Sequence, residues 1–321
     1  MIRVQNLSKH FGMVKAVDNI SFKVEAHENL ILLGTSGCGK TTTLKMINRL
    51  IEPSAGNIFI DGKNVFEQSP EILRRGIGYV LQNNGLFPHY TVAENIAIVP
   101  QLLKWDKKRT EKRVSELLEK LHLSKDHLNA YPNELSGGQQ QRIGLARALV
   151  ADPAVLLMDE PFGALDNVTR SKIHAEFKAL DELKRKTIIM VTHDVQEAFE
   201  LGDHICLMDQ GKIVQNGTPS ELLFKPKNSF VKGFLQEQRL QLEFKTIRLY
   251  DVWNWIAPAS AISKVSGLSA DTDFWSGLEH FKFNDAETIN ITHKETAEIR
   301  SASFEQLMAA FYQYKKQQTH E

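Results

Sequence analysis

At 321 residues the chain is long enough for one large domain and a smaller one, because single hydrophobic cores rarely grow beyond about 250 to 300 residues. Its 39 Lys and Arg residues balance 39 Asp and Glu residues, so no net field favours nucleic acid or an anionic membrane. The two cysteines, Cys38 and Cys206, suggest neither a disulfide framework nor a zinc site, and no signal peptide or membrane-spanning helix is expected.

The predicted elements begin with a strand, a glycine-rich loop and a helix. Residues 30–33 form a short, fully apolar run, which is typical of a buried strand. The loop 34–41 follows directly. After the loop, Leu44, Ile47 and Leu50 recur at helical spacing, so a helix is expected there.

The next region combines short strands with a helical segment. Alternating apolar residues at 58–60 predict one strand, and "RRGIGYVLQ" predicts another that ends at Gln82. From 93 to 123 the pattern becomes helical, because apolar residues recur at a spacing that places them on one face. These residues are Val114, Leu117, Leu118 and Leu121.

Two further apolar runs, 154–160 and 187–194, are unbroken, as expected for strands of a parallel sheet that is buried on both faces. The core is therefore expected to be a doubly wound α/β structure. Residues 205–217 predict a hairpin, and the sequence Thr-Pro-Ser-Glu at 218–221 predicts the capped start of a helix.

The character of the chain changes near residue 235, where the last recognisable segment of the core ends. Residues 240–321 hold three of the four tryptophans, an alternating "TINITHK" and an amphipathic segment near the C-terminus. These patterns predict a small α/β appendage. The expected domains are therefore 1–235 and an accessory domain at 240–321, which could be regulatory.

The loop 34–41, called the phosphate loop below, has the pattern G-x-x-x-x-G-K-T. Its residues are Gly34, Thr35, Ser36, Gly37, Cys38, Gly39, Lys40 and Thr41, with Thr42 directly behind them. The glycines let backbone N–H groups surround phosphate oxygens, and the helix that follows adds its dipole. Lys40 is expected to reach the β- and γ-phosphates, and Thr41 to bind Mg²⁺. Cys38 invites a redox interpretation, but a small packed residue is the simpler one.

Acidic and polar residues stand where the apolar strands end, which is the edge at which parallel sheets bind ligands. Asp159 is expected to hold Mg²⁺ and Glu160 to take a proton from the attacking water, although a solvated acidic pair is the alternative. His193 could bond a γ-phosphate and orient Glu160, or satisfy local backbone groups. Gln82 could contact Mg²⁺ or the lytic water, or be a simple polar turn residue.

A second glycine-rich stretch, "ELSGGQQQR" at 134–142, opens a predicted helix but contains no lysine. A helix N-terminus with bare backbone donors is an anion site. Because the phosphate loop already encloses a phosphate, the second stretch is expected to close over a nucleotide held by another copy of the protein. The chemistry therefore implies a dimer.

These motifs, in this order, resemble those of the nucleotide-binding subunits of ATP-binding-cassette (ABC) transporters. The matching segments are the phosphate loop, Gln82, LSGGQ (135–139), LLMDE (156–160), ALD (164–166) and His193, and the resemblance covers residue 1 to about 235. It implies a P-loop NTPase core with an antiparallel β subdomain and a helical subdomain, about 93–147, that carries the signature motif LSGGQ. The small C-terminal α/β appendage would follow this core.

The resemblance also implies roles for single residues, with ATP and Mg²⁺ as ligands. Phe11 would stack on adenine, and Gln82 would link the nucleotide state to membrane subunits. Ser136 and Gly138 would contact the γ-phosphate held by the partner, and Asp166 would lie at the dimer interface.

Three positions depart from the usual family pattern without removing a catalytic group: His27 stands in place of glycine, and Thr35 and Asn167 in place of proline. Within the family, residues 76–105 look like the importers of osmoprotectants such as glycine betaine, carnitine and choline. Many of those relatives end in paired nucleotide-sensing repeats, for which 240–321 is too short.

The resemblance thus implies the ATPase motor of a membrane importer. It would work as a dimer beneath transmembrane permease subunits, peripheral to the cytoplasmic face of the inner membrane, with an extracytoplasmic solute-binding protein and without nucleic acid. A soluble cassette ATPase acting on ribosomes or DNA is an alternative, but those usually carry two cassettes or a long coiled coil. An importer ATPase for another solute, such as amino acids or polyamines, is a further alternative. A small-molecule kinase would leave LSGGQ without a role.

Overall fold

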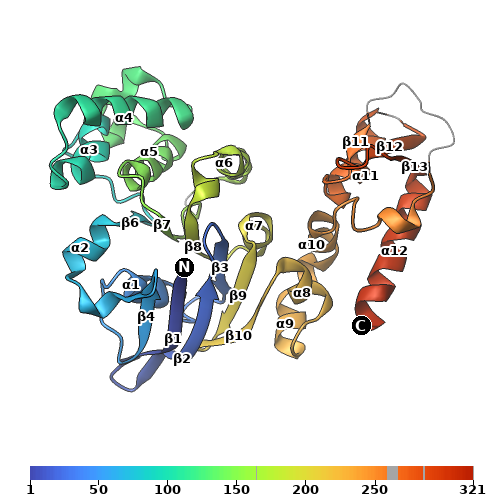
Figure 1. Cartoon of the computed structure of the whole chain (residues 1–321), viewed down its shortest axis with the longest axis horizontal. Coiled ribbons are helices and arrows are strands. Elements are labelled where there is room, and N and C mark those ends of the chain that lie inside the picture. The colour runs from blue at the N-terminus through green and yellow to red at the C-terminus, as the bar shows by residue number, and fades with distance from the viewer. Residues whose placement is uncertain (164, 259–266, 285, 321) are drawn as a thin grey trace. The chain divides into compact units, whose positions relative to one another are not determined.

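The computed structural model describes residues 1–163, 165–258, 267–284 and 286–320 (Figure 1). The chain forms two compact units, Met1–Asn216 and Gly217–Glu321. Among the described residues, no helix has the length and apolar character needed to cross a membrane.

The first unit is built on a six-stranded sheet with the order β10-β9-β3-β8-β7-β6. Its strands are β3 (Asn29–Gly34), β6 (Ile77–Val80), β7 (Val155–Asp159), β8 (Thr187–Thr192), β9 (His204–Asp209) and β10 (Lys212–Gly217). The five strands from β9 to β6 are parallel to their neighbours. β7 and β8 are buried along their whole length, which explains their unbroken apolar sequences. The predicted α/β core is confirmed.

Helices connect the strands of this sheet. They are α1 (Lys40–Ile47), α2 (Pro70–Arg75), α6 (Asn167–Ala179) and α7 (Val195–Leu201). The expectation that the first helix continues through Leu50 is wrong. Arg49 has a φ of +48°, which ends the helical path, and Leu50 is 45% exposed.

A second, antiparallel sheet has the order β2-β1-β4-β5. Its strands are β1 (Ile2–Phe11), β2 (Val14–Val24), β4 (Ala55–Ile60) and β5 (Lys63–Asn64). Ile2 and Val4 of β1 belong to the same buried cluster as Leu30 of β3 and Leu44 of α1. The antiparallel sheet therefore shares a hydrophobic core with the phosphate-loop strand and helix, and the expected β subdomain is confirmed.

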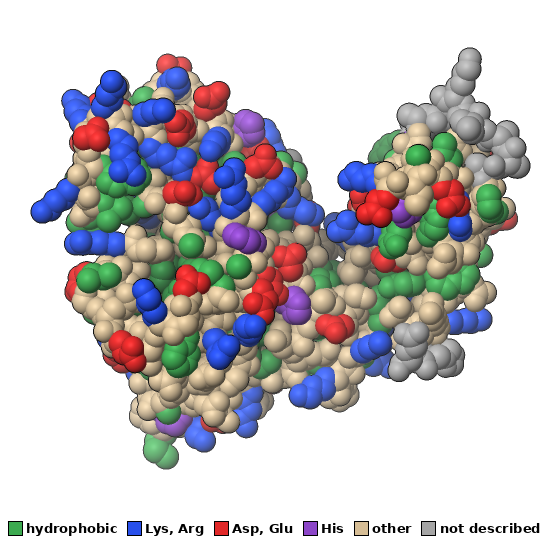
Figure 2. Space-filling model, viewed as in Figure 1, with side chains coloured by type: hydrophobic (Ala, Val, Ile, Leu, Met, Phe, Trp, Pro, Cys, Tyr) green, Lys and Arg blue, Asp and Glu red, His purple; other side chains and the backbone are tan. Residues whose placement is uncertain are grey.

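The helical region contains α3 (Val92–Leu102), α4 (Lys107–Lys120) and α5 (Gly137–Leu149). The four apolar residues predicted to share a face, Val114, Leu117, Leu118 and Leu121, are all buried. Figure 2 shows basic side chains, with acidic ones among them, on the visible surface of this region. On α4 they form i,i+4 pairs such as Lys107–Glu111 and Lys112–Glu116.

The second unit has five α-helices and a small sheet among its described residues. The elements are α8 (Pro219–Phe224), α9 (Ser229–Phe234), α10 (Arg239–Thr246), α11 (Phe274–Asn284), α12 (Phe304–His320), β11 (Leu268–Ser269), β12 (Thr288–Thr292) and β13 (Ile299–Ser303). The rings of Phe244, Phe274 and Phe311 pack against one another in its core, and those of Phe244 and Phe274 are stacked. The predicted α/β composition of the appendage agrees with these elements.

Short 3-10 helices complete the described structure. They are η1 (Val65–Glu67), η2 (Lys125–Asn129), η3 (Pro132–Glu134), η4 (Leu183–Arg185), η5 (Gln236–Gln238) and η6 (Trp253–Trp255).

The boundary between the two units differs from the sequence expectation. The second unit starts at Gly217, so the boundary expected between 235 and 240 lies inside it. The physical reason is the packing of α8 against α10. Arg239 also donates from Nη2 to the carbonyl of Leu223 at 2.7 Å, which ties the two helices together.

Candidate functional site

Four adjacent strands of the parallel sheet, β3, β8, β7 and β6, end at the same edge of the first unit. The phosphate loop follows β3, His193 follows β8, Glu160 follows β7, and Gln82 comes shortly after β6. Because neighbouring parallel strands run in the same direction, the residues that follow them gather along one line. This edge is the candidate site.

The phosphate loop owes its shape to its glycines. The φ angles are +149° at Gly34, +77° at Gly37 and +104° at Gly39. A Cβ on Gly34 would lie 2.1 Å from the carbonyl oxygen of Met208, and one on Gly39 would lie 2.3 Å from that of Ala16, so no larger residue fits. Gly39 caps α1 without a side-chain hydrogen bond, and the first N–H groups of the helix therefore face an anion site.

Lys40 turns its ammonium group into this loop. The residue is 5% exposed, and Nζ donates to the carbonyl oxygens of Gly34 and Thr35 at 2.8 Å each. A positive charge is thus held beside the backbone N–H groups of the loop. This combination attracts phosphate oxygens.

Cys38 is packed inside the loop with 3% of its surface exposed. Burial raises the pKa of its thiol although the Lys40 ammonium lies nearby. A buried, protonated thiol is a poor nucleophile, so packing explains Cys38 better than redox chemistry does. On the outer side of the loop, Ser36 is exposed and Thr35 Oγ1 donates to Asp209 Oδ1 at 3.3 Å.

Thr41 and Asp159 contact each other directly. The hydroxyl Oγ1 of Thr41 donates to Oδ1 of Asp159 at 2.8 Å. Asp159 is 5% exposed, and burial raises its pKa even though the Thr41 bond acts in the opposite direction. Thr42, in the same turn of α1, is half-buried.

The Thr41–Asp159 pair suits Mg²⁺, which prefers oxygen ligands. Mg²⁺ usually takes one or two protein oxygens and completes its shell with water and phosphate oxygens. No group of three or more His, Cys, Asp or Glu side chains that could hold a metal by itself occurs in the described parts of the chain. With its two oxygens in contact, the Thr41–Asp159 pair fits a metal ion that arrives with a nucleotide.

Two of the predicted site residues meet at the carboxylate of Glu160. Gln82 Nε2 donates to Glu160 Oε2 at 3.0 Å, and His193 Nδ1 lies 3.2 Å from the same oxygen. The Glu160 side chain is 19% exposed and that of His193 is 60% exposed. The carboxylate is thus sheltered between an amide and an imidazole that reaches solvent.

The backbone at Glu160 turns sharply as β7 ends. Its φ is +45°, a left-handed conformation that is uncommon for a residue other than glycine. Its N–H still donates to the carbonyl of Val191 at 2.9 Å, as a last bond of the sheet. Such strained positions are often found at functional sites, and this one is held by the adjacent strand.

Gln82 lies beyond its strand rather than at its end. β6 ends at Val80, so the expectation that the strand ends at Gln82 is corrected. The chain turns there because the N–H of Asn84 donates to the carbonyl of Leu81 at 3.1 Å. Gln82 therefore reaches Glu160 from an exposed turn.

Phe11 is the last residue of β1 and is 52% exposed. Lys9 Nζ lies 5.0 Å from the centre of its ring. The neighbouring strand β2 contains Ala16, whose carbonyl oxygen faces Gly39 of the phosphate loop. The strand pair that carries Phe11 thus adjoins this loop.

Ser136 and Gly138 lie at the start of α5. Ser136 Oγ accepts from the N–H of Gln139 at 3.3 Å, and Gln139 Oε1 accepts from the N–H of Ser136 at 2.9 Å, which forms a capping box. Gly138 packs on α6, because a Cβ there would lie 3.2 Å from Thr169 Cγ2. Within the described residues, the hydrogen bonds of Ser136 stay in this turn and do not reach the phosphate loop of the same chain.

The ALD motif is only partly described, because Ala164 lies outside the described residues. Asp166 Oδ1 accepts from the N–H of Thr169 at 3.0 Å and so caps α6, which begins at Asn167. At another of the three departures from the family pattern, His27 has a φ of +66°. A left-handed backbone explains why glycine is usual at that position.

Three residues behind the site did not stand out in the sequence. Arg170 Nη1 lies 3.1 Å from Asp194 Oδ2, and His174 lies between two glutamates of α7. Asp194 caps α7, and Glu197 follows it three residues later. Of these features, a sequence pattern could have revealed only the start of α7, because Asp194 and Glu197 have the spacing of a helix N-terminus.

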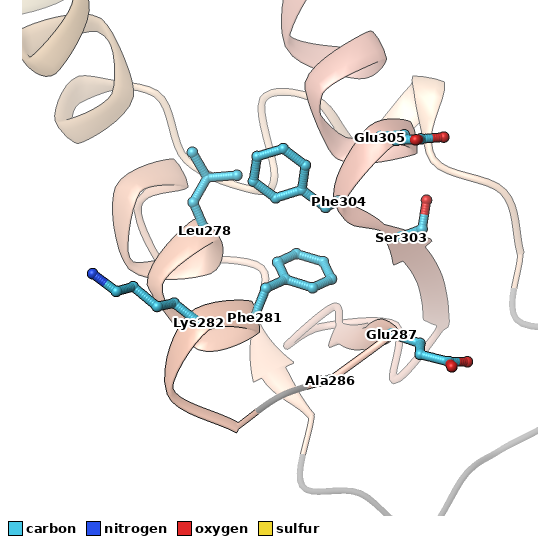
Figure 3. Close-up of a pocket in the computed structure, with 8 residues that line it drawn as sticks. All are labelled: Leu278, Phe281, Lys282, Ala286, Glu287, Ser303, Phe304 and Glu305. Atoms are coloured by element: carbon cyan, nitrogen blue, oxygen red, sulfur yellow. The ribbon is translucent and has the colours of Figure 1, made fainter.

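A separate cavity of about 570 Å³ lies in the second unit (Figure 3). Its lining residues are Leu278, Phe281, Lys282, Ala286, Glu287, Ser303, Phe304 and Glu305. The rings of Phe281 and Phe304 meet edge to face, 5.8 Å apart, whereas Lys282 and Glu287 point outward on opposite sides. None of the predicted site residues lines this cavity.

Comparisons with known proteins agree with this geometry. A family model described as "ABC transporter" matches residues 17–163. A glycine betaine/carnitine/choline transport ATP-binding protein of Bacillus subtilis is 53% identical over 241 residues, which cover 75% of this chain and 63% of that protein. An osmoprotectant import ATP-binding protein of Salmonella typhimurium is 47% identical over 284 residues, which cover 85% of this chain and 74% of that protein. The chain thus spans less than two thirds of the length of the Bacillus protein.

A solved structure of an ATP-binding cassette is similar to this chain in fold. It is a dimeric ATP-binding cassette in a post-hydrolysis state, bound to ADP and Pi. It is 33% identical to this chain, with a TM-score of 0.61, and the match covers 68% of this chain and 98% of that chain.

Proposed function

Because the chain belongs to the ABC transporter family, we propose that it binds and hydrolyses ATP as the motor subunit of a membrane importer. One observation carries the proposal. The phosphate loop, the Thr41–Asp159 pair and the Glu160 carboxylate lie along one edge of the parallel sheet, each at the end of a strand. These are the groups that phosphoryl transfer to water requires.

Binding of ATP is assigned to the phosphate loop and Phe11. The loop N–H groups and Lys40 would hold the β- and γ-phosphates, and the exposed ring of Phe11 would stack on adenine. Thr41 and Asp159 would hold Mg²⁺, which neutralises phosphate charge when bound.

Hydrolysis is assigned to Glu160. Its carboxylate would accept a proton from the attacking water, a contribution of about 10²- to 10⁴-fold to the rate. His193, which contacts Glu160 Oε2, would fix the carboxylate and reach the γ-phosphate from its exposed side. Gln82, which donates a hydrogen bond to the same carboxylate, would relay the nucleotide state to the membrane subunits.

A dimer would complete the site. Ser136 and Gly138 form an anion-binding helix start, and their contacts lie within the helical region and α6. We propose that they close over the γ-phosphate held by a second copy. The dimeric state of the similar cassette bound to ADP and Pi supports this arrangement.

The partners follow from the proposed transport role. We propose that the dimer binds transmembrane permease subunits at the cytoplasmic face of the inner membrane, as a peripheral subunit, and that an extracytoplasmic solute-binding protein delivers the solute. The solute is proposed to be an osmoprotectant quaternary amine such as glycine betaine, carnitine or choline. The transport functions for which the Bacillus and Salmonella relatives are named support this class.

Two measurements test the proposal. The purified protein should release phosphate from ATP in the presence of Mg²⁺, and Lys40→Ala should abolish this. Cells that have lost their own osmoprotectant uptake should regain uptake of labelled glycine betaine, carnitine or choline when this subunit is produced with its permease subunits. Uptake of an amino acid or a polyamine instead would refute the proposed solute class.

A further inference from the structure

We propose that Arg170 is a positioning residue for ATP hydrolysis, which ties Leu165 to the segment that carries His193. The inference rests on the proposed function, because it concerns the rate of that hydrolysis. It assigns no contact with nucleotide to Arg170. Instead, Arg170 would act through Asp194 and the neighbouring His193 on the carboxylate of Glu160.

One side of the Arg170 guanidinium holds Leu165. Nη2 donates to the carbonyl of Leu165 at 3.0 Å, whereas the backbone N–H of Arg170 makes an ordinary helical bond to the carbonyl of Asp166 at 2.8 Å. Leu165 is buried, with 8% exposed. The loop that begins directly after Glu160 is therefore fastened to the first turn of α6.

The other side of the guanidinium holds Asp194. Nη1 lies 3.1 Å from Asp194 Oδ2, while Asp194 Oδ1 accepts from the N–H groups of Gln196 and Glu197 at 2.8 and 3.2 Å. The Asp194 N–H in turn donates to Thr192 Oγ1 at 3.0 Å. The two carboxylate oxygens thus have separate tasks, since one caps α7 and the other binds Arg170.

His193 lies between two residues of this network. Thr192 ends β8 and Asp194 starts α7, so the backbone of His193 is fixed from both sides. The distance from its Nδ1 to Glu160 Oε2 then depends on where Asp194 is held. The two Nη groups of Arg170 bond a loop carbonyl and this carboxylate from one planar fork, a geometry that an ammonium group does not present.

The same two helices offer a control contact. Lys178 of α6 lies 3.8 Å from Glu200 of α7, and the Lys178 side chain is 51% exposed. This ion pair joins α6 to α7 as the Arg170–Asp194 pair does, but from a later turn of α6. Lys178→Gln therefore removes a link between the helices without touching the loop or Asp194.

The test compares steady-state ATP hydrolysis by the full chain and its variants. Arg170→Gln and Asp194→Asn should each lower kcat about 10-fold, with KM for ATP changed less than about 2-fold because the phosphate loop is intact. Asp194→Asn keeps an oxygen to cap α7 and loses the acceptor for Arg170. The kcat of the double variant should be no lower than that of either single variant, because both substitutions remove the same Arg170–Asp194 interaction. Arg170→Lys should regain little, since one ammonium cannot replace the fork.

A second readout does not depend on turnover. The NMR signal of the His193 imidazole should shift in Arg170→Gln and in Asp194→Asn, and stay in place in Lys178→Gln. If the unmodified chain does not hydrolyse ATP, the proposed function is refuted. The NMR signal of His193 alone then decides whether Arg170 positions that residue. An unshifted imidazole, wild-type kcat in both single variants, or an equal loss in Lys178→Gln would each overturn the role of Arg170.

Discussion

The imidazole Nδ1 of His193 lies 3.2 Å from Oε2 of Glu160, although the two residues follow different strands. The strands are β7 and β8, which are adjacent and parallel, and Asp159 pairs with Val191 at their ends. The residues that follow both strands therefore emerge at the same level of the sheet. A single carboxylate at this point can be tested without disturbing the phosphate loop.

Glu160→Gln should keep ATP and Mg²⁺ binding but remove the proposed base. Hydrolysis should fall by about two orders of magnitude or more, and an ATP-bound dimer should accumulate. Phosphate release and size-exclusion chromatography with ATP would measure the two effects. Glu119→Gln, on the exposed surface of α4, should behave like the unmodified protein. Unchanged turnover in Glu160→Gln would exclude Glu160 as the base.

Mixing two inactive variants tests whether LSGGQ serves the partner copy. Lys40→Ala removes the charge that binds phosphate, and Ser136→Arg places a bulky side chain in the LSGGQ segment. In a mixed dimer one site is doubly damaged, but the other combines an intact phosphate loop with an intact LSGGQ segment. With Glu160→Gln in both chains, about one ATP should be trapped per mixed dimer.

The parental homodimers are the controls for this experiment and should trap almost no ATP. The bound nucleotide can be counted after separation of the dimers. If the mixture traps no more ATP per dimer than the parental homodimers do, LSGGQ does not complete the site of the partner copy.

His174 should make stability depend on pH. Its residue is 5% exposed, and burial alone would lower its pKa, but hydrogen bonds and charges from Glu197 and Glu200 outweigh burial and raise it to about 9. Because the folded pKa exceeds the unfolded one, the stabilisation is fully present below about pH 6.5 and is lost as pH rises through 9. The shift corresponds to ~3 kcal/mol of unfolding free energy.

Urea unfolding of His174→Gln at about pH 6 and about pH 10 checks this expectation. The free-energy difference from the unmodified protein should be larger at the lower pH by up to ~3 kcal/mol. The exposed His10→Gln variant should show no such change. The same difference at both pH values for His174→Gln would disprove the charged His174 contact.

Two truncations locate the end of the cassette. A chain that ends at Asn216 should fold and bind ATP, because it keeps the first compact unit. A chain that ends at Arg239 keeps α8 but loses α10 and α12, which contact α8. Leu222 and Leu223 of α8, both fully buried, would then be uncovered, and aggregation is expected.

Solubility and nucleotide binding of the two truncations, each with a Lys40→Ala control, provide the measurement. A soluble, ATP-binding chain ending at Arg239, together with an unfolded chain ending at Asn216, would instead support the boundary near 235 that the sequence suggested.

Much of the fold could be predicted because its signals are local. The apolar runs of β3, β7 and β8 predict these strands, and the capping box of Thr218 and Glu221 predicts the start of α8. The capping box acts within four residues, and burial on both faces makes each strand an unbroken apolar run, so both patterns are visible in the sequence. The end of α1 was missed because a single left-handed residue, Arg49, overrides the helical spacing of Leu50.

By itself, the sequence determined the phosphate loop, the strand-end positions of Asp159 and Glu160, and the family. The tertiary structure alone decided that Gln82 and His193 meet on one oxygen of Glu160, and that Arg170 joins two loops behind them. The physical reason is that strand order, here β8-β7-β6, and side-chain direction depend on packing between segments far apart in the chain. Residue type and spacing report only the local part of that packing.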